Sequence, residues 1–249
     1  MVEKKQASIP RKLWNYIAIP GRTTINLIDK VPRYALGLGK MAFRSGSLGK
    51  TWLTPQASKA AKRAKNAYLD IEHRPLKIDD DFEYLPMFSN SNHSVYVNPE
   101  KKKFLYNIRG SANFKDLRSD IFIINDNMTY DERWFEEKNN LEKLINDFSH
   151  DGYKFDIAGH SLAGKLAIHL TGDPKIAEHI GRADAFNPGA VYNDASLKGL
   201  VDTEKLNVHL ARGDILSEAY EYDNNRIGNI NNYDFGSNPL TAHFMDNFQ

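Results

Sequence analysis

The residues that most clearly could carry out a reaction surround Ser161, in the stretch Ile157-Ala158-Gly159-His160-Ser161-Leu162-Ala163-Gly164. A serine that attacks an acyl carbon commonly lies on a sharp strand-to-helix turn, where small neighbours let the backbone adopt a strained conformation. Gly159 and Ala163 occupy the two flanking positions. The pattern therefore predicts a nucleophile elbow at Ser161. The alternative interpretation is a generic turn of small residues, because short motifs also arise by chance.

A serine hydroxyl needs a histidine to remove its proton, and on this kind of elbow the partners follow in the order serine, acid, histidine. Asp214 lies just beyond the strand-like segment 206–211, where a loop presents side chains at a strand end. His243 is the single histidine after it, so we predict Asp214 as the acid and His243 as the base. The histidines between Ser161 and Asp214 are His169, His179 and His209.

Other assignments of the acid and the base stay open at this point. Asp184 and Asp202 are rival acids, although the first lies inside a predicted strand and the second in a polar loop. Asp214 follows a glycine, as turn-forming aspartates do. His243 lies near the end of the chain, where residues are commonly mobile.

Acyl transfer also requires hydrogen-bond donors for the oxyanion, one from the residue after the nucleophile and one from an earlier strand-to-helix loop. Leu162 supplies the first backbone N–H. We predict Ser111 as the second donor, because Gly110 permits an unusual turn and the serine offers both an N–H and a hydroxyl. A simple serine turn is the alternative at this position.

The elements expected around these residues alternate between strands and helices. That alternation favours an α/β fold with a mainly parallel sheet covered by helices. Hydrophobic periodicity and turn residues predict helices over 56–69, 131–148 and 161–170. They predict strands over 84–88, 94–97, 103–108, 121–124, 154–158, 183–187 and 206–211.

Composition narrows the possible chemistry. The 249 residues, 41% of them hydrophobic, suffice for one large domain with an appendage. There is no cysteine, which excludes disulfides, thiol nucleophiles and cysteine-bound metals. Nothing in the sequence implies a metal or an organic cofactor. We also expect no secretory signal or membrane span, and a cytoplasmic location, because no long apolar run is present.

Charge divides the chain into two parts. Residues 1–65 carry 14 lysines and arginines and two acidic residues. The remainder carries 19 lysines and arginines and 30 acidic residues. We predict a basic, extended or partner-ordered arm over 1–53 and a folded domain over 54–249. Such an arm suits an anionic membrane surface or an acidic protein partner. Nucleic acid is a less favoured partner.

Several of these segments together resemble the class 3, fungal-type triacylglycerol lipases, from about residue 57 to residue 243. The segment 57–68 is similar to the family's opening helix, which ends in an Ala-Tyr pair. The matching motifs are Tyr106-Asn107-Ile108-Arg109-Gly110-Ser111 followed by Asp116 and Ser119-Asp120, the elbow at Ser161, Ala185-Phe186-Asn187-Pro188-Gly189, and Arg212-Gly213-Asp214-Ile215.

The resemblance implies an α/β-hydrolase fold for the domain that follows the basic N-terminal arm, an oxyanion role for Ser111 and a lipid ester as substrate. The family's usual glycine is Ala163 here, its small alanine is Lys165 and its tryptophan is Leu117, and the expected lid is short, over 125–130. These departures favour a small acylglycerol or phospholipid hydrolase. Similar proteins occur in some viruses, so the resemblance implies a virion-associated location as the alternative to a cytoplasmic one. The alternative is a catalytically inactive, lipase-like structural or membrane-binding module, for example in a virus particle.

Overall fold

The computed structural model describes residues 52–79, 81–110, 132–189, 200–221, 227–236 and 241–248. Residues 1–51 of the predicted arm lie outside the described residues, as do Ser111, Leu117, the predicted strand 121–124 and the lid segment 125–130.

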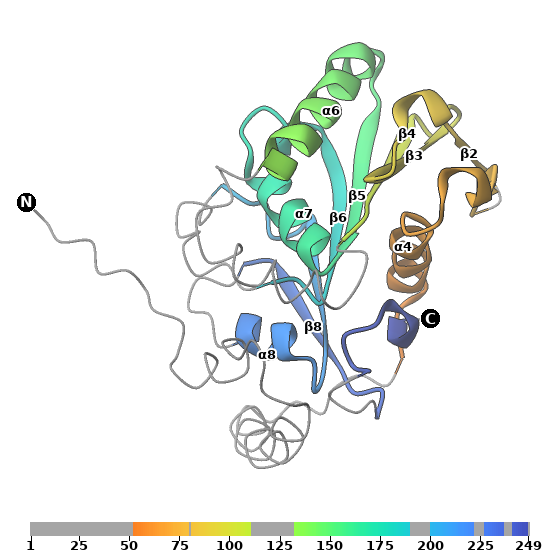
Figure 1. Cartoon of the computed structure of the whole chain (residues 1–249). Helices are drawn as coiled ribbons and strands as arrows, with labels where there is room; N and C mark the ends of the chain where they lie inside the picture. The colour runs from red at the N-terminus through yellow and green to blue at the C-terminus, as the bar shows by residue number, and fades with distance from the viewer. Residues whose placement is uncertain are drawn as a thin grey trace, which may run out of the picture.

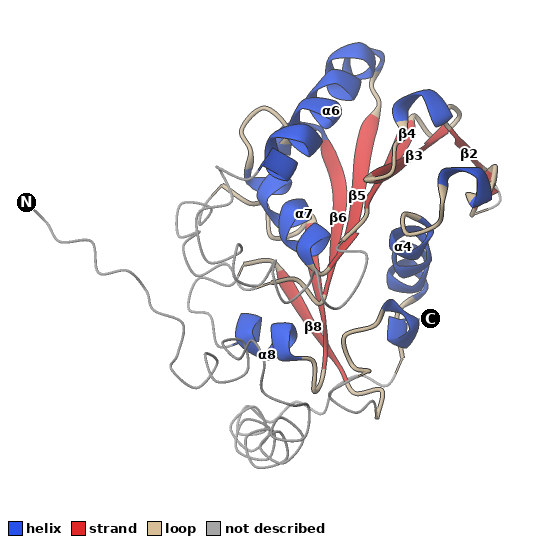
Figure 2. Cartoon of the chain, viewed as in Figure 1, coloured by secondary structure: helices blue, strands red, loops and turns tan. Residues whose placement is uncertain are grey.

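An eight-stranded sheet organises the described residues, and its strands follow one another in sequence order. The first four strands pair in antiparallel fashion, and β4 to β8 pair in parallel (Figure 2). This arrangement confirms the predicted mainly parallel sheet. The strands are β1 (Lys77–Ile78), β2 (Phe82–Tyr84), β3 (His93–Asn98), β4 (Lys103–Ile108), β5 (Lys154–His160), β6 (Ile180–Phe186), β7 (Leu206–Ala211) and β8 (Asn229–Tyr233).

Helices cover both faces of the sheet. The helices α6 (Glu132–Phe148) and α7 (Leu162–Gly172) lie on one face, and α4 (Pro55–Asn66) lies on the other with the C-terminal segment (Figure 1). The remaining helical elements are α8 (Ile215–Glu221), η2 (Ile71–His73), η3 (Pro86–Phe88), η5 (Ser149–Asp151), η6 (Ala177–His179) and η8 (Met245–Phe248). None of the helices in the described ranges has the length and apolar character needed to cross a bilayer.

The start of α4 follows from its sequence. The Thr54 side chain accepts a hydrogen bond from the N–H of Ala57 at 3.2 Å, and Pro55 occupies the first turn, where its missing N–H costs nothing. The helix ends at Asn66, whereas the sequence predicted residue 69.

One predicted strand is wrong. The segment 84–88 forms only the end of β2 at Tyr84 and then the short helix η3. Pro86 has no N–H to donate to a neighbouring strand, so the ladder stops before it. The short strands β1 and β8 and the seven-residue helix α8 were not predicted, because elements this short show little hydrophobic periodicity.

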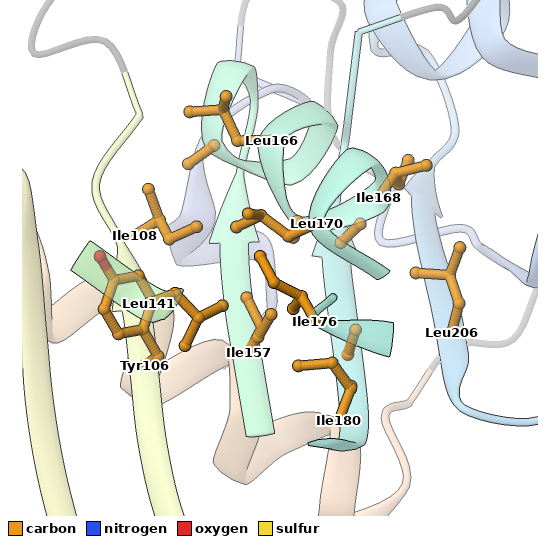
Figure 3. Close-up of a cluster of buried hydrophobic side chains, with 14 of the residues drawn as sticks. Tyr106, Ile108, Leu141, Ile157, Leu166, Ile168, Leu170, Ile176, Ile180 and Leu206 are labelled. Atoms are coloured by element: carbon orange, nitrogen blue, oxygen red, sulfur yellow. The ribbon is translucent and has the colours of Figure 1, made fainter. Parts of the chain in front are cut away.

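The core has two layers, one on each face of the sheet. Side chains of α6 and α7, such as Leu141 and Leu166, pack against Tyr106 of β4, Ile157 of β5 and neighbouring strand residues (Figure 3). On the opposite face the small side chains of Ala60, Ala61 and Ala64 bring α4 close to Phe186, Tyr233 and Phe248. This second layer holds the C-terminal segment against the sheet.

The alanine face of α4 gives a stability prediction. Ala61 is fully buried, so Ala61→Leu is expected to lower the free energy of unfolding by about 1–3 kcal/mol through overpacking. Lys62→Leu adds the same side chain at the next, exposed position and should change it by less than about 0.5 kcal/mol. Urea unfolding followed by circular dichroism measures both. Equal effects would show that α4 does not pack on the sheet through this face.

Candidate active site

Ser161 lies at the turn between β5 and α7, with a φ of 62° and a ψ of −123°. Residues other than glycine rarely adopt such a positive backbone φ, so the surrounding packing must hold this conformation. Gly159 allows the close approach: a Cβ there would lie 2.3 Å from the carbonyl oxygen of Ala163. The strand, turn and helix predicted around Ser161 are all present, and all eleven residues of α7 are buried.

Asp214 and His243 meet at the same edge of the sheet. Asp214 follows β7 and is fully buried, and its Oδ1 lies 2.8 Å from Nδ1 of His243. The other carboxylate oxygen accepts the backbone N–H of Ser217 at 2.8 Å. Burial acts to raise the pKa of Asp214, but the attraction of His243 and the hydrogen bonds from His243 and Ser217 outweigh it. The pKa of this carboxyl is therefore below its ordinary value.

Asn187, at the end of β6, joins the strand ends to the segment that carries His243. Its Oδ1 accepts the N–H of Ala211 and the hydroxyl of Ser217, each at 2.8 Å. Its Nδ2 lies 3.1 Å from the carbonyl oxygen of Ala242 and 3.3 Å from that of His243. This residue appeared in the sequence only as part of a matched segment, and nothing there indicated these bonds.

The segment that carries His243 packs firmly against the sheet. His243 has 7% of its surface exposed, and Ala242 is fully buried. The following residues, Met245 and Phe248, belong to the apolar layer beneath α4. This position is therefore not a loose tail.

The hydroxyl of Ser161 has a distinct environment. Among the described residues its oxygen is buried and makes no hydrogen bond, with His243 or with any other group. The adjacent His160 does reach His243: the two ring centroids lie 4.7 Å apart, and Nε2 of His160 lies 2.7 Å from the carbonyl oxygen of His243. The structure thus brings the elbow and the His243 segment into contact without joining the two predicted reacting side chains.

The two described residues that follow β4, Arg109 and Gly110, are here called the β4 loop, and they are held from α6. Arg133 donates to the carbonyl oxygen of Arg109 at 2.8 Å and to Glu137 at 3.0 Å. Glu137 is fully buried and also accepts the hydroxyl of Tyr106 at 2.7 Å. Desolvation acts to raise the pKa of Glu137, but His93, Arg133 and Tyr106 lower it further than burial raises it. The predicted donor Leu162 begins α7, whereas Ser111 lies outside the described residues.

The rival acids and histidines have other surroundings. Asp184, inside β6, pairs with His209 at 2.9 Å and with Arg182 at 2.7 Å. Asp202 is exposed and accepts the N–H of Glu204. His169 lies in α7 against the ring of Trp134, and His179 lies in η6. Among the described residues, one group of three side chains could hold a metal ion, and all of its members are exposed: Asp70, Glu72 and His73.

Comparisons with known proteins show the fold. No protein-family model matches the sequence, and no curated protein sequence matches it. The structure of Lip2 lipase from Yarrowia lipolytica matches with 16% identity and a TM-score of 0.50, over 74% of this chain and 82% of that chain. A triacylglycerol lipase from Penicillium expansum matches with 18% identity and a TM-score of 0.49, over 72% of this chain and 78% of that chain. The first likeness confirms the predicted α/β-hydrolase fold, and a fold by itself does not fix a function.

The lowered pKa of Asp214 makes its contribution to stability depend on pH. A carboxyl with a depressed folded-state pKa stabilises the fold above its unfolded pKa, about 3.9, and loses this contribution as the pH falls through the folded value. Asp214→Asn should therefore lower the free energy of unfolding by about 1.5–3 kcal/mol at neutral pH, as expected for a hydrogen-bonded charge. The difference between the two proteins should shrink below about pH 4.

Urea unfolding of both proteins between pH 3 and pH 7 tests this dependence. Other carboxyls contribute equally to both curves and cancel in the difference. A difference that stays constant over the whole range would contradict an ionised Asp214 in the folded protein.

Proposed function

We propose that this protein is a serine-dependent carboxylic ester hydrolase of the class 3 lipase type that acts on lipid esters. The observation that carries the proposal is the buried Asp214–His243 pair, 2.8 Å apart, at the sheet edge where the positive-φ turn presents Ser161. An acid that orients a histidine beside a serine on such a turn is the arrangement that acyl transfer requires.

The proposed reaction has two steps. His243 accepts the Ser161 proton at Nε2 as the serine oxygen attacks the ester carbonyl carbon, while Asp214 holds Nδ1–H and stabilises the imidazolium. The N–H of Leu162 and the donors of Ser111 bind the oxyanion. The C–O bond to the alcohol then breaks as His243 protonates the departing oxygen, which leaves an acyl-enzyme. Water, deprotonated by His243, releases the carboxylic acid and returns the proton to Ser161.

Acylglycerols and phospholipids are the substrate classes we propose. The likeness in fold to a lipase supports a lipid ester, and the motifs around Ser161 and Asp214 support the ester chemistry. We further propose that the basic residues of 1–53 contact an anionic membrane surface or an acidic protein partner. The excess of positive charge in that part of the chain supports this second proposal.

A non-catalytic module is the second candidate function. The observation that favours it is the buried Ser161 hydroxyl oxygen, which makes no hydrogen bond with His243 among the described residues. Hydrogen bonds of catalytic groups are often long without substrate and tighten in the complex, so this geometry is compatible with both functions. A fluorophosphonate probe separates them, because only an activated serine reacts with it.

The triad assignment predicts the behaviour of two variants. Ser161→Ala and His243→Ala should each lower kcat for acyl ester hydrolysis by at least about 10³-fold, because the nucleophile and its base act as a unit. Probe labelling should disappear in Ser161→Ala. The measurement is hydrolysis of short and long acyl esters and of phospholipid vesicles.

The matched control is Ser91→Ala, which removes an exposed serine hydroxyl outside the proposed site and should leave kcat unchanged. Full esterase activity in Ser161→Ala would refute the assignment. Absence of both turnover and labelling in the wild type would favour the non-catalytic module.

A further inference from the structure

A continuous set of hydrogen bonds crosses the candidate site beside Ser161. The backbone N–H of Gly110 in the β4 loop donates to the hydroxyl oxygen of Tyr68 at 3.1 Å. That hydroxyl lies 3.0 Å from Nδ1 of His160, and Nε2 of His160 lies 2.7 Å from the carbonyl oxygen of His243. These bonds connect the end of the α4 segment, the β4 loop, the elbow and the segment of the proposed base.

The chemistry of the groups fixes the direction of each bond. A carbonyl oxygen can only accept, so Nε2 of His160 carries the proton that reaches His243. A neutral imidazole has one N–H, so Nδ1 of His160 accepts and the Tyr68 hydroxyl donates to it. The oxygen of Tyr68 is then available to accept from Gly110. Each of the three hydrogen bonds thus has one donor and one acceptor.

The protonation states that this direction requires are stable around neutral pH. Burial, and secondarily the proximity of His243, lower the pKa of His160 to about 3, so its ring is neutral. Burial raises the pKa of Tyr68 to about 12, so its hydroxyl keeps its proton. The donor and acceptor in each of these hydrogen bonds therefore stay the same between mildly acidic and mildly basic pH.

The fit around Gly110 shows how tightly the β4 loop approaches these groups. A Cβ at Gly110 would lie 2.4 Å from the hydroxyl oxygen of Tyr68 and 2.4 Å from the carbonyl oxygen of His160. No larger residue fits at this point without moving the loop or the elbow. Arg133 also holds the loop, because it donates to the carbonyl oxygen of Arg109 at 2.8 Å.

We propose that the Tyr68–His160 bridge sets the position of the β4 loop relative to His243, and that Tyr68 and His160 are positioning residues for the ester hydrolysis proposed above. The inference rests on that proposed function. Ser111, the proposed oxyanion donor, follows Gly110 of the β4 loop directly in the sequence, and His243 moves the proton. Both must keep their places relative to Ser161, because displacements of about 1 Å at reacting groups can cost about 100-fold in rate.

Tyr68→Phe tests the bridge with the loss of one oxygen atom. This variant leaves the Gly110 N–H and Nδ1 of His160 without their partner, while the aromatic ring remains. It should lower kcat by about 10- to 100-fold and change KM by less than about threefold, because the groups affected act on the transition state. A residue that only stabilised the fold would lower the fraction of active enzyme instead. Titration of active sites with the fluorophosphonate probe measures that fraction, and kcat is expressed per labelled site.

Two further variants sharpen the test. Tyr153→Phe removes the hydroxyl of a tyrosine just before β5, at the end of that strand opposite His160, and should leave kcat within twofold of the wild type. His160→Gln keeps a donor and an acceptor, whereas His160→Leu keeps neither, so the glutamine variant should retain more of kcat than the leucine variant.

The outcomes separate the two proposals. An active wild type with an unchanged kcat in Tyr68→Phe, or with a change in KM alone, would overturn the bridge and leave the proposed function standing. A drop of similar size in Tyr153→Phe would overturn it as well. A wild type that neither turns over esters nor reacts with the probe would overturn the proposed function, and the positioning role would fall with it.

Discussion

The positive-φ turn at Ser161 is the constraint on which the rest of the candidate site depends. At this turn β5 and α7 approach so closely that a side chain at Gly159 would collide with the backbone of Ala163. The helix α7 is buried along its whole length, so packing on all sides offsets the cost of the strained backbone. The turn sets the place of His160, of Ser161 and of the N–H of Leu162 together, and the partners must assemble around it.

Polar groups buried at the sheet edge then determine where those partners lie. A buried charge or amide is costly unless its hydrogen bonds are made, so each such group fixes its neighbours. Asp214 takes hydrogen bonds from His243 and Ser217, and Asn187 joins β7 to the backbone of the His243 segment. His160 binds the same backbone from the elbow. The position of His243 thus results from several independent contacts as well as from its bond to Asp214.

The two faces of the sheet contribute to the site in different ways. On the α6 face, the buried Glu137 holds Arg133, and Arg133 holds the β4 loop. On the α4 face, the alanines of α4 and the aromatic side chains around Phe186 hold the segment that follows His243. Tyr68 lies just after α4 and contacts both the β4 loop and the elbow. Packing on both faces of the sheet thereby holds the segments that carry the candidate reacting groups at this edge.

The sequence by itself predicted the features that rest on local patterns. The alternation of strands and helices predicted the parallel part of the sheet, the small residues around Ser161 predicted the strand-to-helix turn, and chain order singled out Asp214 and His243, which the structure places in contact. The structure shows that contact, and the catalytic roles of Ser161, Asp214, His243, Leu162 and Ser111 remain predictions. Only the tertiary structure decided the contacts of Asn187 and the Tyr68–His160 bridge, since their partners lie 24 to 92 residues apart in the chain. A single tyrosine or asparagine carries no periodic signal in the sequence. Its contacts depend on which polar groups from distant parts of the chain are buried beside it and need a hydrogen-bond partner.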